Sequence, residues 1–236
     1  MTFNIKTIED INDYIGNEPY TLYLTSAKHV ADFLRSKNEC VCIVLKDEDE
    51  NELREFGEYK YFIDKDGVED IEHLKKIYCH MNNIPHVIAA NDSIIIREET
   101  PDDLKKIYAM YDDDACRKFL TPLPPFYTFD TDRRFASVKN GYMLFGYGMW
   151  VIEKTETHEV IGRVGFEYND ATSVSLGFMI KESERNKGYA YSAAHIVVNY
   201  LNKTMPEMKI VAKCHEDNED SIKILESLNL EYNIIE

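Results

Sequence analysis

The chain has no apolar run close to the roughly 18 residues that a membrane-spanning helix needs. Its first residues, MTFNIKTIED, lack the basic and then apolar pattern of a secretory signal. Positive charge is scarce, with 27 Lys and Arg against 43 Asp and Glu and a net charge of −16. A surface of that sign repels the phosphates of nucleic acids. We therefore expect a cytoplasmic protein that binds neither membranes nor nucleic acids.

Cysteines are few, and their number is odd. The chain has five, without the regular spacing of a disulfide framework. Cys40 and Cys42 alternate onto one face of a predicted strand, but no second pair or suitably spaced His follows to complete a metal site. We expect reduced, buried thiols and no bound metal.

The first 91 residues alternate strand-like and helix-like patterns, which predicts a small, largely parallel α/β sheet. The segment 7–16 resembles a capped helix that Thr7 opens and Gly16 closes. The charged segment 46–58 reads as a loop and the segment 82–92 as a linker. The other expected elements are strands at 20–25, 40–45 and 59–64 and helices at 26–38 and 68–83.

The remaining residues, 92–236, predict a second domain with a mixed, mostly antiparallel sheet. Thr100 and Pro101 mark the start of a helix. Three strands over 148–180 are separated by short turns, which favours an antiparallel meander. The proline-rich and aromatic stretch 121–135 reads as an irregular loop that either closes on a substrate or packs over the sheet.

The turn ERNKGYAY, residues 184–191, carries the clearest chemical signal. It lies between the predicted strand SVSLGFMI and a helix whose apolar residues recur at helical spacing. The first N–H groups of a helix have no intrahelical partner and attract anions. Gly188 lets a phosphate approach those groups, and Arg185 and Lys187 add positive charge. The pattern indicates a phosphate site.

The segment LGFMIKESERNKGYAYSAA is similar to the acyl-CoA-binding segment of the GNAT superfamily of N-acetyltransferases, of the ribosomal-protein-acetyltransferase type. Arg185, Gly188 and Ala190 match its Arg/Gln-x-x-Gly-x-Gly/Ala turn in register. Asn218 and Ser221 match its Asn-x-x-Ser element. The order of elements over the last three-fifths of the chain also resembles that family.

The resemblance implies a place for acetyl-CoA as cosubstrate. The backbone of Phe178, Met179 and Ile180 would pair with the pantetheine arm, and a donor near Phe178 would polarise the thioester carbonyl. The amides of the segment from Lys187 through Tyr189 to Ala190 would hold the pyrophosphate. Asn218 would hydrogen-bond the pantetheine, with Ser221 in the same element.

The acid and base are not evident from the resemblance. Ser175, Ser192 and Leu225 stand where relatives carry a glutamate, a second glutamate and a tyrosine. The family's final strand also has no counterpart before Glu236, which leaves open whether a partner supplies it. Candidate catalytic residues are Glu167, His215 in the segment CHED, and Tyr232 as a substitute for the missing tyrosine.

These observations predict an N-acetyltransferase in which a primary amine, on a small molecule or a peptide, attacks acetyl-CoA directly within a ternary complex. The alternative is a non-catalytic acyl-CoA-binding sensor. Residues 1–91 resemble a small α/β domain that precedes the acetyltransferase domain in some bacterial proteins. The strand end YLTSA has no aspartate nucleophile, so we expect a non-catalytic lid, homodimer element or sensor.

Overall fold

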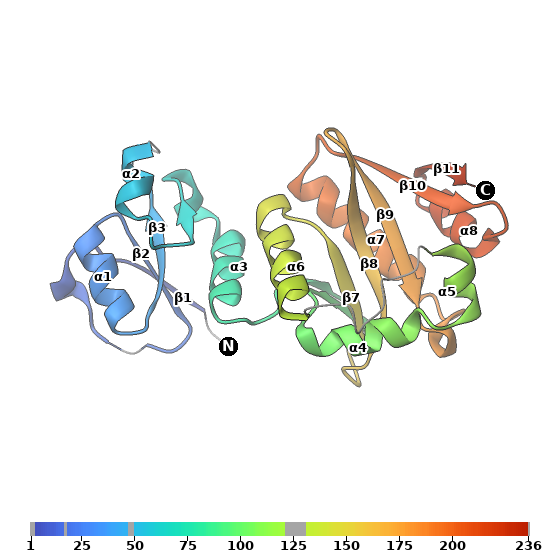
Figure 1. The fold of residues 1–236 in the computed structure, drawn as a ribbon, viewed down its shortest axis with the longest axis horizontal. Helices are drawn as coiled ribbons and strands as arrows, with labels where there is room; N and C mark the ends of the chain where they lie inside the picture. Colours follow the sequence, from blue (N-terminus) through green and yellow to red (C-terminus); the bar gives the residue numbers. More distant parts are fainter. Residues whose placement is uncertain (1–2, 17, 47–49, 121–130, 236) are drawn as a thin grey trace. The chain divides into compact units, whose positions relative to one another are not determined.

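The computed structural model describes residues 3–16, 18–46, 50–120 and 131–235 (Figure 1). Side-chain descriptions further exclude residue 115 and residues 131–134. The chain forms two compact units, Met1–His86 and Val87–Glu236. Among the described residues, no helix is long and apolar enough to cross a membrane.

The first unit is built on a parallel four-stranded sheet whose strands follow one another in chain order. Its helices pack on both faces. Tyr23 and Ile43 share one apolar core with Val30 and Leu34 of α1. The opposite face packs against α3. The elements are β1 (Asn4–Thr7), η1 (Ile11–Asp13), β2 (Thr21–Thr25), α1 (Lys28–Ser36), β3 (Cys40–Val44), α2 (Glu50–Glu55), β4 (Phe62–Ile63), η2 (Asp66–Glu69) and α3 (Ile71–Met81).

The predicted parallel sheet is confirmed, but two local expectations are wrong. No α-helix covers 7–16: β1 pairs with β2 from Asn4 opposite Thr21, and only the three-residue 3-10 helix η1 follows, with Asp10 as its N-cap. The pairing with β2 links residues far apart in the chain, so no local pattern reveals it. Within the expected loop 46–58, α2 forms beside the buried Phe56, which joins the core of the α1 face.

The second unit has a seven-stranded sheet in its described residues, in the order β11-β10-β9-β8-β7-β6-β5. Neighbours from β5 to β9 are antiparallel, whereas β10 is parallel to both β9 and β11. The expected mixed, mostly antiparallel sheet is therefore confirmed. Its strands are β5 (Val87–Ala90), β6 (Ile94–Arg97), β7 (Met149–Lys154), β8 (Val160–Asp170), β9 (Ser173–Ile180), β10 (Lys209–His215) and β11 (Glu231–Ile235).

Helices cover both faces of this sheet (Figure 1). One face carries α7 and α8, whose buried Val197 and Leu225 share a core with Trp150 and Ala212. On the other face Ile107 and Met110 of α4 pack against Val151, Val160 and Met179. The helical elements are α4 (Pro101–Met110), α5 (Asp114–Phe119), α6 (Thr131–Phe145), η4 (Glu182–Glu184), α7 (Tyr189–Thr204) and α8 (Glu219–Ser227).

A buried ionic cluster ties α4 to the sheet. Arg97 bonds to Asp103 at 2.7 Å and to Glu153 at 2.7 Å, and Asp103 also accepts from the N–H and hydroxyl of Thr100. The Asp103 side chain is only 1% exposed. Thr100 and Asp103 thus start α4, at the place where the sequence predicts it.

Two expectations for this half of the chain need correction. The segment 82–92 is not simply a linker, because its residues 87–90 form the strand β5. A hairpin turn at Asn91 connects β5 to β6, and the two strands pair antiparallel. Residues 121–130 of the expected irregular stretch 121–135 lie outside the described residues. Its last residues are helical rather than irregular, because α6 begins at Thr131. The roles predicted for 121–130 concern residues that are not described.

Candidate functional site

The pairing between β9 and β10 ends before the strands do. Leu176 and Ala212 are their last partners, yet β9 runs on to Ile180 beside β8, and β10 runs on to His215 beside β11. Among the described strands, none fills the opening between these two ends. Apart from the carbonyl of Ile180, which accepts from the Nε of Arg185, one edge of β9 beyond Leu176 therefore has backbone groups available for an extended ligand.

The turn after β9 leads directly into the N-terminus of α7. Gly188 precedes the helix with φ +81°, a left-handed conformation that glycine adopts without strain. A Cβ added there would meet no atom within 4 Å. The first intrahelical bond runs from the N–H of Ser192 to the carbonyl of Gly188, so helical geometry leaves the N–H groups of residues 189–191 without intrahelical partners. Open space therefore adjoins a set of backbone donors.

A cavity of about 370 Å³ joins the strand opening to this turn. Residues of β9, the following turn, α7, α8 and α5 line it. The lining residues are Cys116, Phe119, Leu120, Phe178, Met179, Ile180, Glu184, Arg185, Asn186, Gly188, Tyr189, Ala190, Tyr191, Asn218, Asp220, Ser221 and Ile224.

The predicted cofactor residues converge on this cavity, with one exception. Lys187 does not line it, because its ammonium group bonds to the carbonyl of Ser183 and the carboxylate of Glu184. Asn218 is the N-cap of α8, and its side-chain oxygen accepts a hydrogen bond from the N–H of Ser221 at 3.3 Å. The lining set thus joins two sequence elements, the glycine turn and the Asn-x-x-Ser segment, that lie about 30 residues apart.

The three candidate catalytic residues are not brought together, and none lines the cavity. Glu167 pairs with Ser175 on the α4 face of the sheet, three residues before Phe178 and so about 10 Å along the strand. His215 ends β10 at one side of the opening, and its Nδ1 accepts from the N–H of Asp217 at 3.1 Å.

Tyr232 lies on the opposite face of the sheet from these two. It is the register partner of Ala212, whose side chain packs against the α7 and α8 core. Its hydroxyl donates to Glu226 at 3.2 Å, and partial desolvation and that carboxylate raise the pKa of Tyr232. Tyr232 and Glu167 therefore lie on opposite faces of the sheet.

The short helix α5 is the part of the site that sequence analysis missed. It contributes Cys116 and Phe119 to the cavity wall, and Leu120 follows at its end. Burial, and next the carboxylate of Asp113, raise the pKa of the Cys116 thiol to about 12, so this thiol stays protonated at neutral pH. The sequence did contain a signal for the start of this helix. Asp113 stands three residues before Cys116, and its carboxylate accepts a hydrogen bond from the Cys116 N–H, as an N-cap does.

The described residues hold no group of three or more His, Cys, Asp or Glu side chains arranged to bind a metal ion. The site itself offers backbone donors, a cavity lined by apolar and polar side chains, and the N-terminus of α7.

Comparison with known proteins identifies the second unit. Residues 93–231, more than half of the chain, match the acetyltransferase (GNAT) domain. The chain belongs to the GNAT acetyltransferase family. This match confirms the resemblance drawn from the glycine turn and assigns an acyltransferase domain to the unit that holds the cavity.

Two proteins of Bacillus subtilis (strain 168) are similar to this chain. An uncharacterized N-acetyltransferase, YjdG, is 33% identical over 85 residues, which are 35% of this chain and 51% of YjdG. The uncharacterized protein YkkB is 25% identical over 91 residues, 37% of this chain and 53% of YkkB. The matched region thus spans about half the length of each of these two relatives.

Solved structures share the fold at low identity. An acetyltransferase from Agrobacterium tumefaciens str. C58 has a TM-score of 0.51 and 20% identity, over 59% of this chain and 81% of that one. The ribosomal-protein-S5-alanine acetyltransferase of Vibrio fischeri has a TM-score of 0.50 and 16% identity, over 61% and 81%. These similarities cover the GNAT unit and establish its fold.

Proposed function

We propose that this protein is an N-acetyltransferase that moves the acetyl group of acetyl-CoA to a primary amine by direct attack in a ternary complex. The observation that carries the proposal is the single cavity that joins the open edge of β9 to the N-terminus of α7. A pantetheine arm needs extended backbone partners, and a pyrophosphate needs clustered N–H donors. The cavity offers both in the right order.

In this proposal different residues bind different parts of the cofactor. Backbone groups of Phe178, Met179 and Ile180 would pair with the pantetheine, and an N–H at this edge would stabilise the negative charge that develops on the carbonyl oxygen of the thioester. The amides from Lys187 to Ala190 would hold the pyrophosphate. Asn218 would donate its amide N–H to the pantetheine while its oxygen stays on Ser221. Acetyl-CoA fits this set as cosubstrate.

The acceptor is a primary amine on a small molecule or a peptide. An amine with a pKa near 10.4 is neutral in roughly one molecule in two thousand at pH 7, so the site must remove a proton before attack. His215, at the edge of the opening, is better placed for this than Glu167. A water chain from the amine to the loop after His215, or to His215 once its Nδ1 releases the N–H of Asp217, would supply the path.

A non-catalytic acyl-CoA sensor is the second candidate. The observation that favours it is the absence of Glu167, His215 and Tyr232 from the cavity lining in the described part of the chain. One experiment separates the two: calorimetry with CoA, followed by thiol release from acetyl-CoA over a panel of amines. Binding with amine-dependent release supports the enzyme. Binding without release for any amine supports the sensor, and absent binding contradicts both.

For the first unit we propose an accessory, non-catalytic role, as a lid, sensor or homodimer element. Polar side chains at the carboxyl edge of its sheet form hydrogen bonds to other residues of the same unit. The carboxylate of Glu9 accepts from the N–H and hydroxyl of Ser26, and that of Glu52 accepts from the N–H of Lys46. An assay with a generic phosphate ester should show no hydrolysis.

A further inference from the structure

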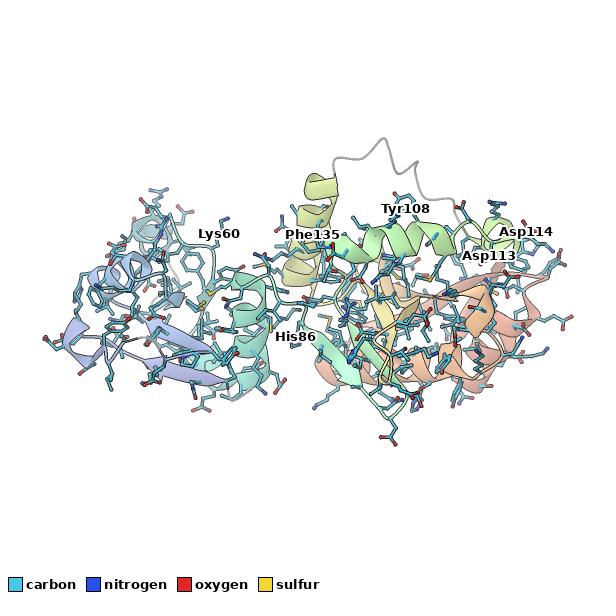
Figure 2. All side chains as sticks on the ribbon, turned by 90° about the horizontal axis from the view of Figure 1, so that it is seen from below. Lys60, His86, Tyr108, Asp113, Asp114 and Phe135 are labelled. Carbon is cyan, nitrogen blue, oxygen red and sulfur yellow. The ribbon has the colours of Figure 1, made fainter. Side chains whose placement is uncertain are left out.

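The side chain of Arg185 is turned toward protein groups in the described structure. Its Nε donates to the carbonyl of Ile180 at 3.0 Å, and its Nη2 donates to the carboxylate of Asp113 at 2.6 Å and lies 3.6 Å from the Cys116 thiol. The side chains of Arg185 and Asp113 are 30% and 14% exposed. The guanidinium thus connects the end of β9 to the start of α5, where Figure 2 labels Asp113.

Asp113 is held in its charged form by this arrangement. Burial works against its charge, but hydrogen bonds from Cys116 and then from Arg185 lower its pKa. One carboxylate therefore caps α5 and binds the arginine of the glycine turn at the same time. Removing either partner leaves a partly buried charge without its counterion.

The other end of α5 meets the far side of the strand opening. The ring of Phe119 lies 5.5 Å from the imidazole of His215, and Lys118 pairs with Asp217 at 2.8 Å. That ion pair is exposed and contributes little. Six residues at about 1.5 Å each give α5 a length of about 9 Å, close to the distance of about 10 Å between a strand and its second neighbour.

We infer that Arg185 is a positioning residue that, through Asp113, holds α5 across the opening between β9 and β10. The bond to Asp113 fixes the wall formed by Cys116, Phe119 and Leu120 against the cavity. The cavity then has a defined width where the pantetheine arm of its ligand would lie. The inference rests on the proposed function for the identity of that ligand, and it differs from a direct contact of Arg185 with phosphate.

The two roles of Arg185 predict different results for Arg185→Gln, Asp113→Ala and the double variant. Amide hydrogen exchange over residues 116–120, measured on the full chain without ligand, should rise about tenfold in Arg185→Gln and further in Asp113→Ala, which also loses the cap on Cys116, and the double variant should exchange no faster than Asp113→Ala. Asp113→Asn keeps the cap on Cys116 and should give a smaller rise. Lys181→Ala removes a comparable pair with Glu159 at 2.7 Å that does not touch α5, and should change nothing there.

Binding of CoA and of phosphate-free pantetheine completes the test. A positioning role predicts that Arg185→Gln weakens both ligands by the same factor, about five to tenfold. If Arg185→Gln weakens CoA alone, and exchange over residues 116–120 is unchanged, Arg185 binds phosphate and the inference is wrong. A wild-type protein that binds neither ligand contradicts the proposed function, and the exchange comparison still decides whether Arg185 holds α5.

Discussion

Asp103 accepts hydrogen bonds from Arg97 at the end of β6 and from Thr100 at the start of α4, so one buried carboxylate joins the two elements. Asp103→Ala should lower the free energy of unfolding by about 3–5 kcal/mol, because it leaves the Arg97 charge without that partner. Urea unfolding measures the loss. Lys106→Ala removes only an exposed partner of Asp103 at 3.7 Å and should cost less than about 0.5 kcal/mol.

The same carboxylate predicts a pH dependence. Although burial opposes its charge, the hydrogen bonds from Arg97 and Thr100 lower the pKa of Asp103 below its usual 3.8. Its contribution to stability is therefore full above the unfolded-state pKa and is lost as the pH falls through the lower folded-state value. Between pH 6 and pH 3 the wild type should lose more stability than Asp103→Ala. Equal losses would mean that Asp103 does not titrate with unfolding.

Gly188→Val should weaken CoA binding about a hundredfold, since the new side chain would fill the open space in front of the α7 amides. The left-handed backbone adds a strain of about 1–2 kcal/mol. Gly16→Val is the matched control, because Gly16 also has a positive φ, +90°, and lies in the other unit. Calorimetry should find CoA affinity unchanged in that control. Unchanged affinity in a folded Gly188→Val protein would remove the phosphate site.

The variant Asn218→Asp distinguishes the two roles of this side chain, the capping of α8 and the proposed binding of the ligand. The aspartate retains an oxygen for the N–H of Ser221 but loses the amide donor proposed for the pantetheine. Thermal stability should stay within about 1 kcal/mol of the wild type while CoA binds about tenfold more weakly. Asn218→Ala should lose both. If Asn218→Asp binds CoA as the wild type does, the side chain only caps the helix.

His215→Phe tests the proton path while keeping an aromatic ring against Phe119. We expect kcat/KM to fall about a hundredfold with little change in CoA affinity, and to recover partly as the pH rises and more amine arrives neutral. Glu167→Gln should have a smaller effect, because Glu167 lies about 10 Å along the strand from Phe178. Wild-type rates from pH 6 to 9 in both variants and in their double variant would contradict this path.

A protein comprising residues 86–236 should fold and bind CoA within about threefold of the full chain. The prediction follows because, in the described part of the chain, the apolar cores of the second unit are made of residues of that unit, and because β5 is retained. Circular dichroism and calorimetry provide the measurements. A folded but non-binding protein would show that the first unit contributes to the site.

Elements with strong local patterns could be predicted from the sequence. The Thr100 start of α4, the meander from β7 to β9 and the apolar stripe of α7 all lie where the sequence places them. The strand β1 and the helices α2 and α5 could not be predicted, because a segment of four to six residues carries too little periodicity. Contacts with segments far away in the chain determine whether such a short segment forms a strand or a helix.

The site was predictable in its lining but not in its geometry. The sequence GFMI reads as an ordinary strand, and nothing in it shows that pairing with β10 stops at Leu176. Charge alone suggested that Arg185 and Lys187 face a phosphate. Their partners Asp113 and Glu184 are visible only once the chain is folded, and Asp113 lies 72 residues from Arg185.

The hairpin that begins at Val87 has a mechanical consequence. The first unit joins the second through β5, an outer strand of the seven-stranded sheet, and at the open end of the β5–β6 hairpin rather than at its turn. Tension applied through residue 86 would therefore break the hydrogen bonds between β5 and β6 one after another, starting at Val87. The edge of the sheet would yield at low force, while the opening between β9 and β10, three strands further in than β6, would stay intact.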